Sequence, residues 1–88
     1  MTARQVTVVN ALGLHARAAA RFVKVASRFR SQIRVTRGQQ TMDGKSILGL
    51  LLLAAARGSQ ITITADGPDD AEAVAALSAL VERGFEDA

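Results

Sequence analysis

The spacing of hydrophobic residues divides the chain into seven segments. Four short stretches rich in β-branched residues predict strands, and three longer stretches with apolar residues three or four positions apart predict helices. In chain order we expect a strand at 6–9, a helix from 16 to about 29, strands at 33–37 and 41–43, a helix at 47–56, a strand at 61–64 and a helix starting at 68. The order β-α-β-β-α-β-α favours an α+β fold, with one mostly antiparallel sheet and helices on one face.

The first predicted helix is amphipathic. Its apolar face consists of Phe22, Val23, Ala26 and Phe29. Its opposite face, which we call the basic stripe, consists of Arg17, Arg21, Lys24 and Arg28. Such a row is usually the solvated face of a helix, but its position also suits the steering of an acidic protein toward the start of the helix.

The second predicted helix, 47–56, is apolar on all sides. It is too short to span a bilayer, which takes about 20 residues, so no membrane insertion is expected. A helix on one face of a small sheet exposes one side, so some of its leucines should form a surface patch of the kind that binds a partner. The alternative is a wholly buried helix.

Ser46 is the expected N-cap of this second helix, and Gly58 lies just past its expected end.

The third predicted helix has Pro68 at its first position and acidic residues in its first turn. Its core stripe consists of Val74, Leu77 and Val81. Gly84 is expected to end it, which leaves 85–88 as a short tail.

Composition narrows the possible functions. With 88 residues the chain is expected to form a single domain, 1–88, around an aliphatic core, since only 3% of its residues are aromatic. The absence of cysteine excludes disulfides, thiolate nucleophiles and most zinc sites. No apolar signal core follows the N-terminus, so we expect a cytoplasmic protein. The net charge of +3 permits an acidic partner, but the scarcity of aromatic residues argues against a nucleic-acid-binding module.

The only histidine, His15, lies where the loop gives way to the first helix, with Arg17 two residues on. A neutral imidazole can attack phosphorus, and an arginine can bind phosphate oxygens through forked hydrogen bonds. The free N–H groups of Ala16 and Arg17 at the helix start can bind further oxygens. The residues therefore suggest a phosphoryl acceptor without metal or cofactor. The alternative is that His15 is an ordinary capping or surface residue.

Ser46 offers a second place for phosphate. A phosphoserine at a helix start is favoured locally, and its charge beside an apolar patch would repel an acidic partner. Helix capping is the simpler role for this serine.

Two segments together resemble the HPr family, the histidine-containing phosphocarriers of the bacterial phosphoenolpyruvate-dependent phosphotransferase system. They are Gly13–Arg17, which reads Gly-Leu-His-Ala-Arg, and Lys45–Gly49, which reads Lys-Ser-Ile-Leu-Gly. The resemblance covers essentially the whole chain. It implies an open-faced β-sandwich of four antiparallel strands and three helices. The family pattern has proline where this chain has Ala18, and alanine restores one N–H near the site.

The resemblance also implies roles for individual residues. His15 would take a phosphoryl group on Nδ1 from phosphorylated enzyme I and pass it to an enzyme IIA domain, with Arg17 stabilising the phosphate. The protein would thus be a transfer intermediate, expected to be monomeric, rather than a turnover enzyme. Ser46 would be the target of an HPr kinase/phosphorylase. The surface for enzyme I and enzyme IIA would comprise Ala16, Ala20, Lys24, Ile47, Leu48 and Leu51. An alternative within the family is a regulatory paralogue in a nitrogen-related branch without sugar transport.

Overall fold

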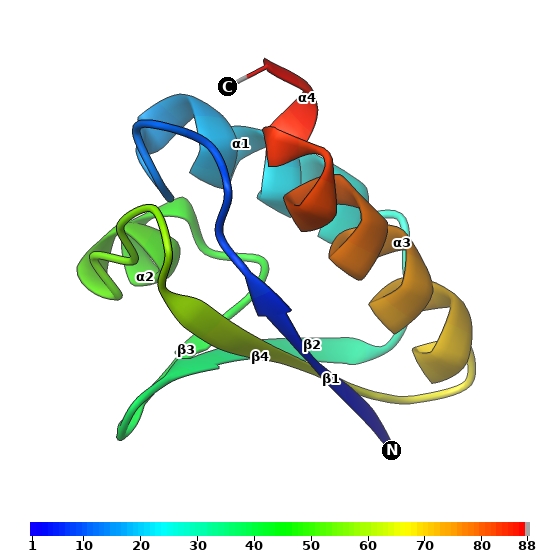
Figure 1. Cartoon of the computed structure of the whole chain (residues 1–88). Helices are drawn as coiled ribbons and strands as arrows, with labels where there is room; N and C mark the ends of the chain where they lie inside the picture. Colours follow the sequence, from blue (N-terminus) through cyan, green and yellow to red (C-terminus); the bar gives the residue numbers. More distant parts are fainter. Residues whose placement is uncertain (88) are drawn as a thin grey trace.

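Four antiparallel strands form one sheet, in the spatial order β1-β4-β2-β3 (Figure 1). They are β1 (Thr2–Thr7), β2 (Gln32–Arg37), β3 (Gln40–Asp43) and β4 (Gln60–Asp66). The computed structural model describes residues 1–87. Buried residues alternate with more exposed ones along the two central strands: Ile33, Val35, Ile61, Ile63 and Ala65 are buried. This alternation places one face of the sheet against the helices and leaves the other face open.

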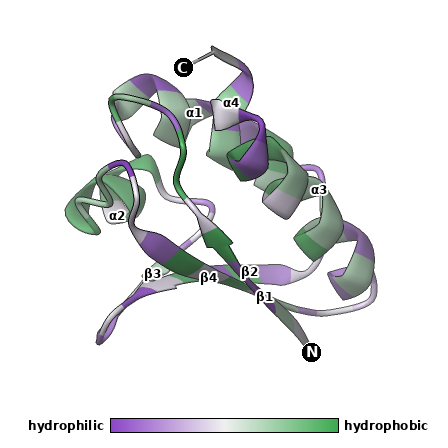
Figure 2. Ribbon diagram, viewed as in Figure 1, coloured by the Kyte–Doolittle hydropathy of each residue, from purple (hydrophilic) through white to green (hydrophobic). Residues whose placement is uncertain are grey.

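The helices lie on one side of the sheet, as the sequence predicts (Figure 1). They are α1 (Ala16–Ala26), α2 (Ile47–Leu52), α3 (Asp70–Glu82) and the short α4 (Gly84–Asp87). Figure 2 shows that α2 is hydrophobic along most of its length. The element order and the antiparallel open-faced sheet match the predicted fold class, with α4 as a fourth helical segment that was not predicted.

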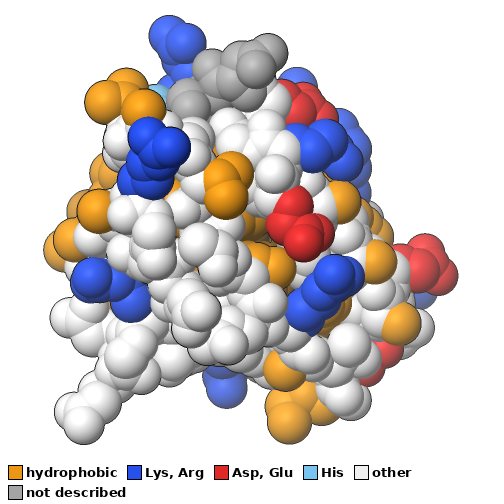
Figure 3. All heavy atoms as spheres, in the orientation of Figure 1, with side chains coloured by type: hydrophobic (Ala, Val, Ile, Leu, Met, Phe, Trp, Pro, Cys, Tyr) orange, Lys and Arg blue, Asp and Glu red, His pale blue; other side chains and the backbone are white. Residues whose placement is uncertain are grey.

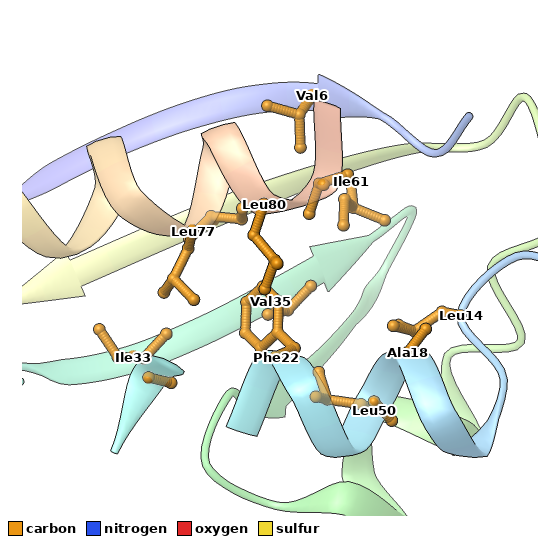
Figure 4. Packing of buried hydrophobic residues seen from close by; sticks show 14 of the residues in the cluster. Val6, Leu14, Ala18, Phe22, Ile33, Val35, Leu50, Ile61, Leu77 and Leu80 are labelled. Atoms are coloured by element: carbon orange, nitrogen blue, oxygen red, sulfur yellow. The ribbon is translucent and has the colours of Figure 1, made fainter. Parts of the chain in front are cut away.

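The core forms where α1 and α3 meet the sheet. Phe22 of α1 and Leu80 of α3 meet beside Val35 of β2, and Leu77 of α3 belongs to the same cluster (Figure 4). All four side chains are buried. Burying each large aliphatic or aromatic side chain contributes roughly 1.5–3 kcal/mol, so this cluster is the main support for the helical layer.

Two helices end earlier than predicted. The predicted end of α1 near residue 29 is wrong because the chain tightens after Ala26: the N–H groups of Arg28 and Phe29 bond to carbonyls only three residues back. The predicted end of the second helix near residue 56 is wrong because Ala54 has a φ of 50°, which stops a right-handed helix. Gly58 therefore lies in the following loop and not at the helix end.

The first strand and the last helix also differ from their predicted bounds. The first strand was predicted at 6–9 but runs from Thr2 to Thr7, because its polar residues pair with β4 from Ala65 to Gln60. The last helix begins at Asp70, so Pro68 precedes it and is not its first residue. Gly84, with a φ of 68°, follows the end of α3 as predicted. Phe85, which begins the segment predicted as a short tail, is completely buried.

Candidate functional site

Hydrogen bonds and one glycine fix the conformation of the loop before α1. The N–H of Gly13 donates to the carbonyl of Asn10, and the Nδ2 of Asn10 donates back to the carbonyl of Gly13 at 2.7 Å. The N–H of Leu14 donates to the carbonyl of Ala55 at 2.9 Å. Gly13 has a φ of 65°, and a Cβ there would lie 2.5 Å from the Ala55 carbonyl oxygen. Only glycine fits this position, so the loop holds the next residues in one place.

His15 is the N-cap of α1. Its backbone is extended (φ −85°, ψ −176°), and its carbonyl accepts the first helical hydrogen bond from the N–H of Ala19 at 2.8 Å. Its side chain makes no capping hydrogen bond. The ring is half-buried, and its Nε2 is buried without a hydrogen-bond partner among the residues described. The ring therefore stands at the helix start with Nε2 directed inward and is not used as a cap.

The first turn of α1 is a set of free backbone donors. Within the described part of the chain, the N–H groups of Ala16, Arg17 and Ala18 have no hydrogen-bond acceptor. The first turn also has no acidic residue. Free N–H groups and the positive end of the helix dipole together favour an anion beside His15.

The basic stripe lies along the outer side of the same helix. Arg17, Lys24 and Arg28 are exposed, and none of them forms an ion pair with another described residue. Arg21 differs, since its Nη1 donates to the carbonyls of Phe85 (2.8 Å) and Glu86. Three free positive charges therefore remain for an anion or an acidic surface.

An apolar patch covers the outer side of α2, which packs against α1. The patch consists of Ile47, Leu48, Leu51 and Leu52, all exposed, whereas Leu50 is buried. The prediction that some of these leucines reach the surface is confirmed, and the wholly buried alternative is wrong. Leu48 is 68% exposed and Leu52 is 57% exposed, so the sequence analysis missed a major member in Leu52.

Leu12 is a second hydrophobic residue that the sequence analysis missed. It is 72% exposed and lies in the rigid loop that leads to His15. Figure 3 shows hydrophobic and basic side chains interspersed on the face that includes the edge of the histidine. Ala16 and Ala20, predicted as partner contacts, are also exposed on α1. A large hydrophobic residue in the loop between the first strand and the first helix was the available signal for Leu12.

Ser46 is the N-cap of α2. Its Oγ accepts a hydrogen bond from the N–H of Gly49 at 3.1 Å, as predicted for a capping serine. The neighbouring Lys45 is bound to the turn that follows α1, because its Nζ donates to the carbonyl of Phe29 at 2.8 Å. Ser46 is half-buried and directly precedes Ile47, the first residue of the apolar patch.

Two kinds of site are not found in the described residues. No group of His, Asp and Glu side chains within 1–87 could hold a metal ion. None of the helices described is long and apolar enough to cross a membrane.

Comparison with known proteins gives consistent results. A family model described as "PTS HPr component phosphorylation site" matches residues 2–83. The chain is 46% identical to phosphocarrier protein HPr of Cupriavidus necator, over 97% of this chain and 96% of that protein. It is 42% identical to phosphocarrier protein NPr of Shewanella violacea, over 97% and 93%. Its fold matches the crystal structure of an HPr from Thermoanaerobacter tengcongensis with a TM-score of 0.95, 39% identity and coverage of 100% and 99%.

Proposed function

The chain belongs to the HPr family of phosphocarrier proteins of the phosphotransferase system, and from this premise we propose that His15 is the residue that carries the phosphoryl group. The observation that supports this most directly is the half-buried ring at the start of α1, whose Nε2 is buried. With Nε2 turned inward, Nδ1 is the nitrogen that receives the group. The neutral ring then keeps its proton on Nε2 and its nucleophilic lone pair on Nδ1.

The transfer is a substitution at phosphorus. The Nδ1 lone pair attacks the phosphorus atom held by phosphorylated enzyme I, and a P–N bond to His15 forms. The bond from phosphorus to enzyme I breaks, and its electron pair stays on enzyme I. The free N–H groups of Ala16 and Arg17 and the guanidinium of Arg17 bind the phosphoryl oxygens. The second transfer, to an enzyme IIA domain, follows the same course with His15 as the donor.

Both partners dock on one surface in this proposal. It combines the apolar patch with the α1 residues Ala16, Ala20 and Lys24, all of which are exposed. The unpaired charges of the basic stripe draw acidic partners toward it, so the rate of phosphotransfer falls as ionic strength rises. The protein acts as a cytoplasmic monomer that meets each partner in turn.

The deciding experiment is incubation with phosphoenolpyruvate and enzyme I, with wild type and His15→Ala compared directly. Wild type should acquire an acid-labile phosphate, and the variant should acquire none. The Arg17→Gln variant should still be labelled, but more slowly. Equal labelling of wild type and His15→Ala would exclude His15 as the carrier.

Ser46 is the proposed regulatory residue. A phosphate on its Oγ places about two negative charges beside the apolar patch, which weakens docking of an acidic partner. ATP and an HPr kinase/phosphorylase should give wild type an acid-stable phosphate that Ser46→Ala lacks. If the two proteins are labelled equally, Ser46 is not the target.

The NPr relative supports a second candidate, a regulatory phosphocarrier in a nitrogen-related branch. The two candidates share the chemistry of His15 and differ in the acceptor. Transfer from the phosphorylated protein to a sugar-specific enzyme IIA supports sugar transport, and transfer only to a regulatory IIA-like protein supports the alternative.

A further inference from the structure

We propose that a groove between α1 and the end of α3 binds a small phosphate monoester, at a site separate from His15. We call it the α1–α3 groove. It is lined by residues of α1, of α3 and of the segment that follows α3: Arg21, Lys24, Val25, Arg28, Leu80 and Glu86. The inference goes beyond the proposed function, because binding here needs neither a phosphohistidine nor a protein partner.

The α1–α3 groove carries an excess of positive charge. Two of its three basic side chains, Lys24 and Arg28, are exposed and form no ion pair with another described residue. The one carboxylate in its lining, that of Glu86, lies 3.2 Å from Nη2 of Arg83, which is outside the groove. Three cations and one carboxylate leave two positive charges in excess. A phosphate monoester carries roughly −1.5 to −2 at neutral pH, so its charge matches this excess.

Arg21 gives the α1–α3 groove a phosphate-binding group that is already held in place. Its side chain is half-buried, and its Nη1 donates to the carbonyls of Phe85 (2.8 Å) and Glu86. These neutral carbonyls orient the guanidinium without neutralising it, and its Nε and Nη2 have no acceptor among the described residues. Guanidinium N–H groups bind phosphate oxygens through forked hydrogen bonds, and a group that is already oriented needs little reorganisation to do so.

The size and the apolar part of the α1–α3 groove favour a small organic ligand. Its volume is about 270 Å³, near the lower end of the roughly 300–1,000 Å³ of small-molecule sites. Val25 in its lining is half-buried, and Leu80 is buried beneath it. These side chains can contact the organic part of a monoester while the basic side chains bind its phosphate, so we expect a monoester to bind better than inorganic phosphate.

The α1–α3 groove lies on a different side of α1 from the apolar patch. α1 packs against α2 and also against α3 (Figure 1). At 3.6 residues per turn, Arg21 and Arg28 lie roughly a quarter of a turn from Ala20, which belongs to the proposed docking surface. Lys24 is the one residue in both sets. The groove is therefore a second binding site and not a part of the apolar patch.

The test is an NMR titration of the unphosphorylated, ¹⁵N-labelled protein with phenyl phosphate, in about 0.15 M salt to screen weak long-range attraction. The amides of Val25, Arg28 and Leu80 should shift and reach saturation. Shifts confined to residues 16–18 would place the anion at the start of α1 and overturn the inference, and so would shifts that never saturate. Inorganic phosphate should bind more weakly, and equal affinity for the two probes would exclude a site for monoesters.

Two variants test the role of charge. Arg28→Gln removes a charged donor whose exposed side chain has no partner to lose, so the Kd for phenyl phosphate should rise about tenfold. Arg57→Gln is the matched control, because Arg57 is also exposed and lies outside the groove lining. It should keep the wild-type Kd, and an equal loss in the two variants would mean that only net charge matters.

The titration contains no enzyme I and no phosphoenolpyruvate, so its outcome is independent of the labelling experiment on His15. Failure of phenyl phosphate to bind would overturn this inference and leave the proposed function intact. A His15 that is never phosphorylated would overturn the proposed function and leave the α1–α3 groove as it is.

Discussion

Asp69 shows how a single carboxylate can hold two distant segments together. It accepts hydrogen bonds from the N–H groups of Arg30 and Ser31, both at 2.9 Å, and from the Oγ of Ser31 at 2.5 Å. These bonds, led by the one from the Ser31 hydroxyl, lower the pKa of Asp69 from 3.8 to about 2. Asp69 is the N-cap of α3 and yet does not cap it with its side chain, so its role is to tie the start of α3 to the start of β2.

A pH dependence follows from this carboxylate. Because its pKa is lower in the folded protein, its contribution to stability is complete above the unfolded value and is lost as pH falls from about 4 to about 2. Asp69→Asn should therefore have a lower Tm than wild type at pH 7, and the difference should shrink toward pH 2. Thermal unfolding at several pH values checks this, and a difference that does not change with pH would contradict it.

Ala54 lies in a backbone conformation that favours glycine. Its φ is 50°, and its side chain is exposed after the end of α2. Ala54→Gly should raise the free energy of unfolding by about 0.5–1 kcal/mol, because relief of this strain exceeds the added freedom of the unfolded chain. Ala56→Gly is the matched control. Its φ is not positive, so it should be neutral or destabilising in urea unfolding, and a stable control with an unstable Ala54→Gly would refute the explanation.

At the scale of the element, α2 depends on Ser46 for its start. The helix has only six residues, and the bond from the Gly49 N–H to the Ser46 Oγ is its one side-chain cap. Ser46→Ala should lower the free energy of unfolding by about 1 kcal/mol, whereas Ser46→Asp, which can also accept the N–H, should keep most of it. Chemical unfolding of both variants checks this. Equal losses would show that the cap contributes little.

The boundaries of helices and strands were predictable where neighbouring residues determine them. They were less predictable where contacts with distant residues determine them. The start of α1 directly after His15 follows from adjacent residues, so the sequence predicted it. The end of α2 depends on one backbone angle at Ala54, and the start of β1 depends on its register with β4. Hydrophobic spacing contains neither piece of information, so both boundaries were misplaced.

The site was predictable in the same measure. Its helix start, its basic stripe and an exposed side of α2 follow from helical spacing. The inward direction of Nε2 and the free N–H of Ala18 are properties of three-dimensional packing. The exposure of Leu12 depends on a loop fold that Gly13 sets, and sequence spacing does not describe it.

At the scale of the whole molecule, Phe85, which follows α3, is part of the hydrophobic core. Phe85 is completely buried, and Arg21 holds its carbonyl from α1. Phe85→Ala should lower the free energy of unfolding by about 3–5 kcal/mol, a large part of the 5–15 kcal/mol typical of small domains. Glu86→Ala, which removes an exposed ion pair with Arg83, is the control and should cost less than about 1 kcal/mol. Similar losses in denaturant titrations would mean that residues 85–86 do not serve the core.

The open face of the sheet has a practical consequence. The helices and the proposed docking surface lie on the other side, and Thr64 of the central strand β4 is not buried. Because the chain has no cysteine, Thr64→Cys would provide a single thiol for a fluorophore or a surface tether. A protein immobilised by that thiol would keep His15 turned toward the solution, so successive encounters with its donor and its acceptor could be followed on one molecule at a time.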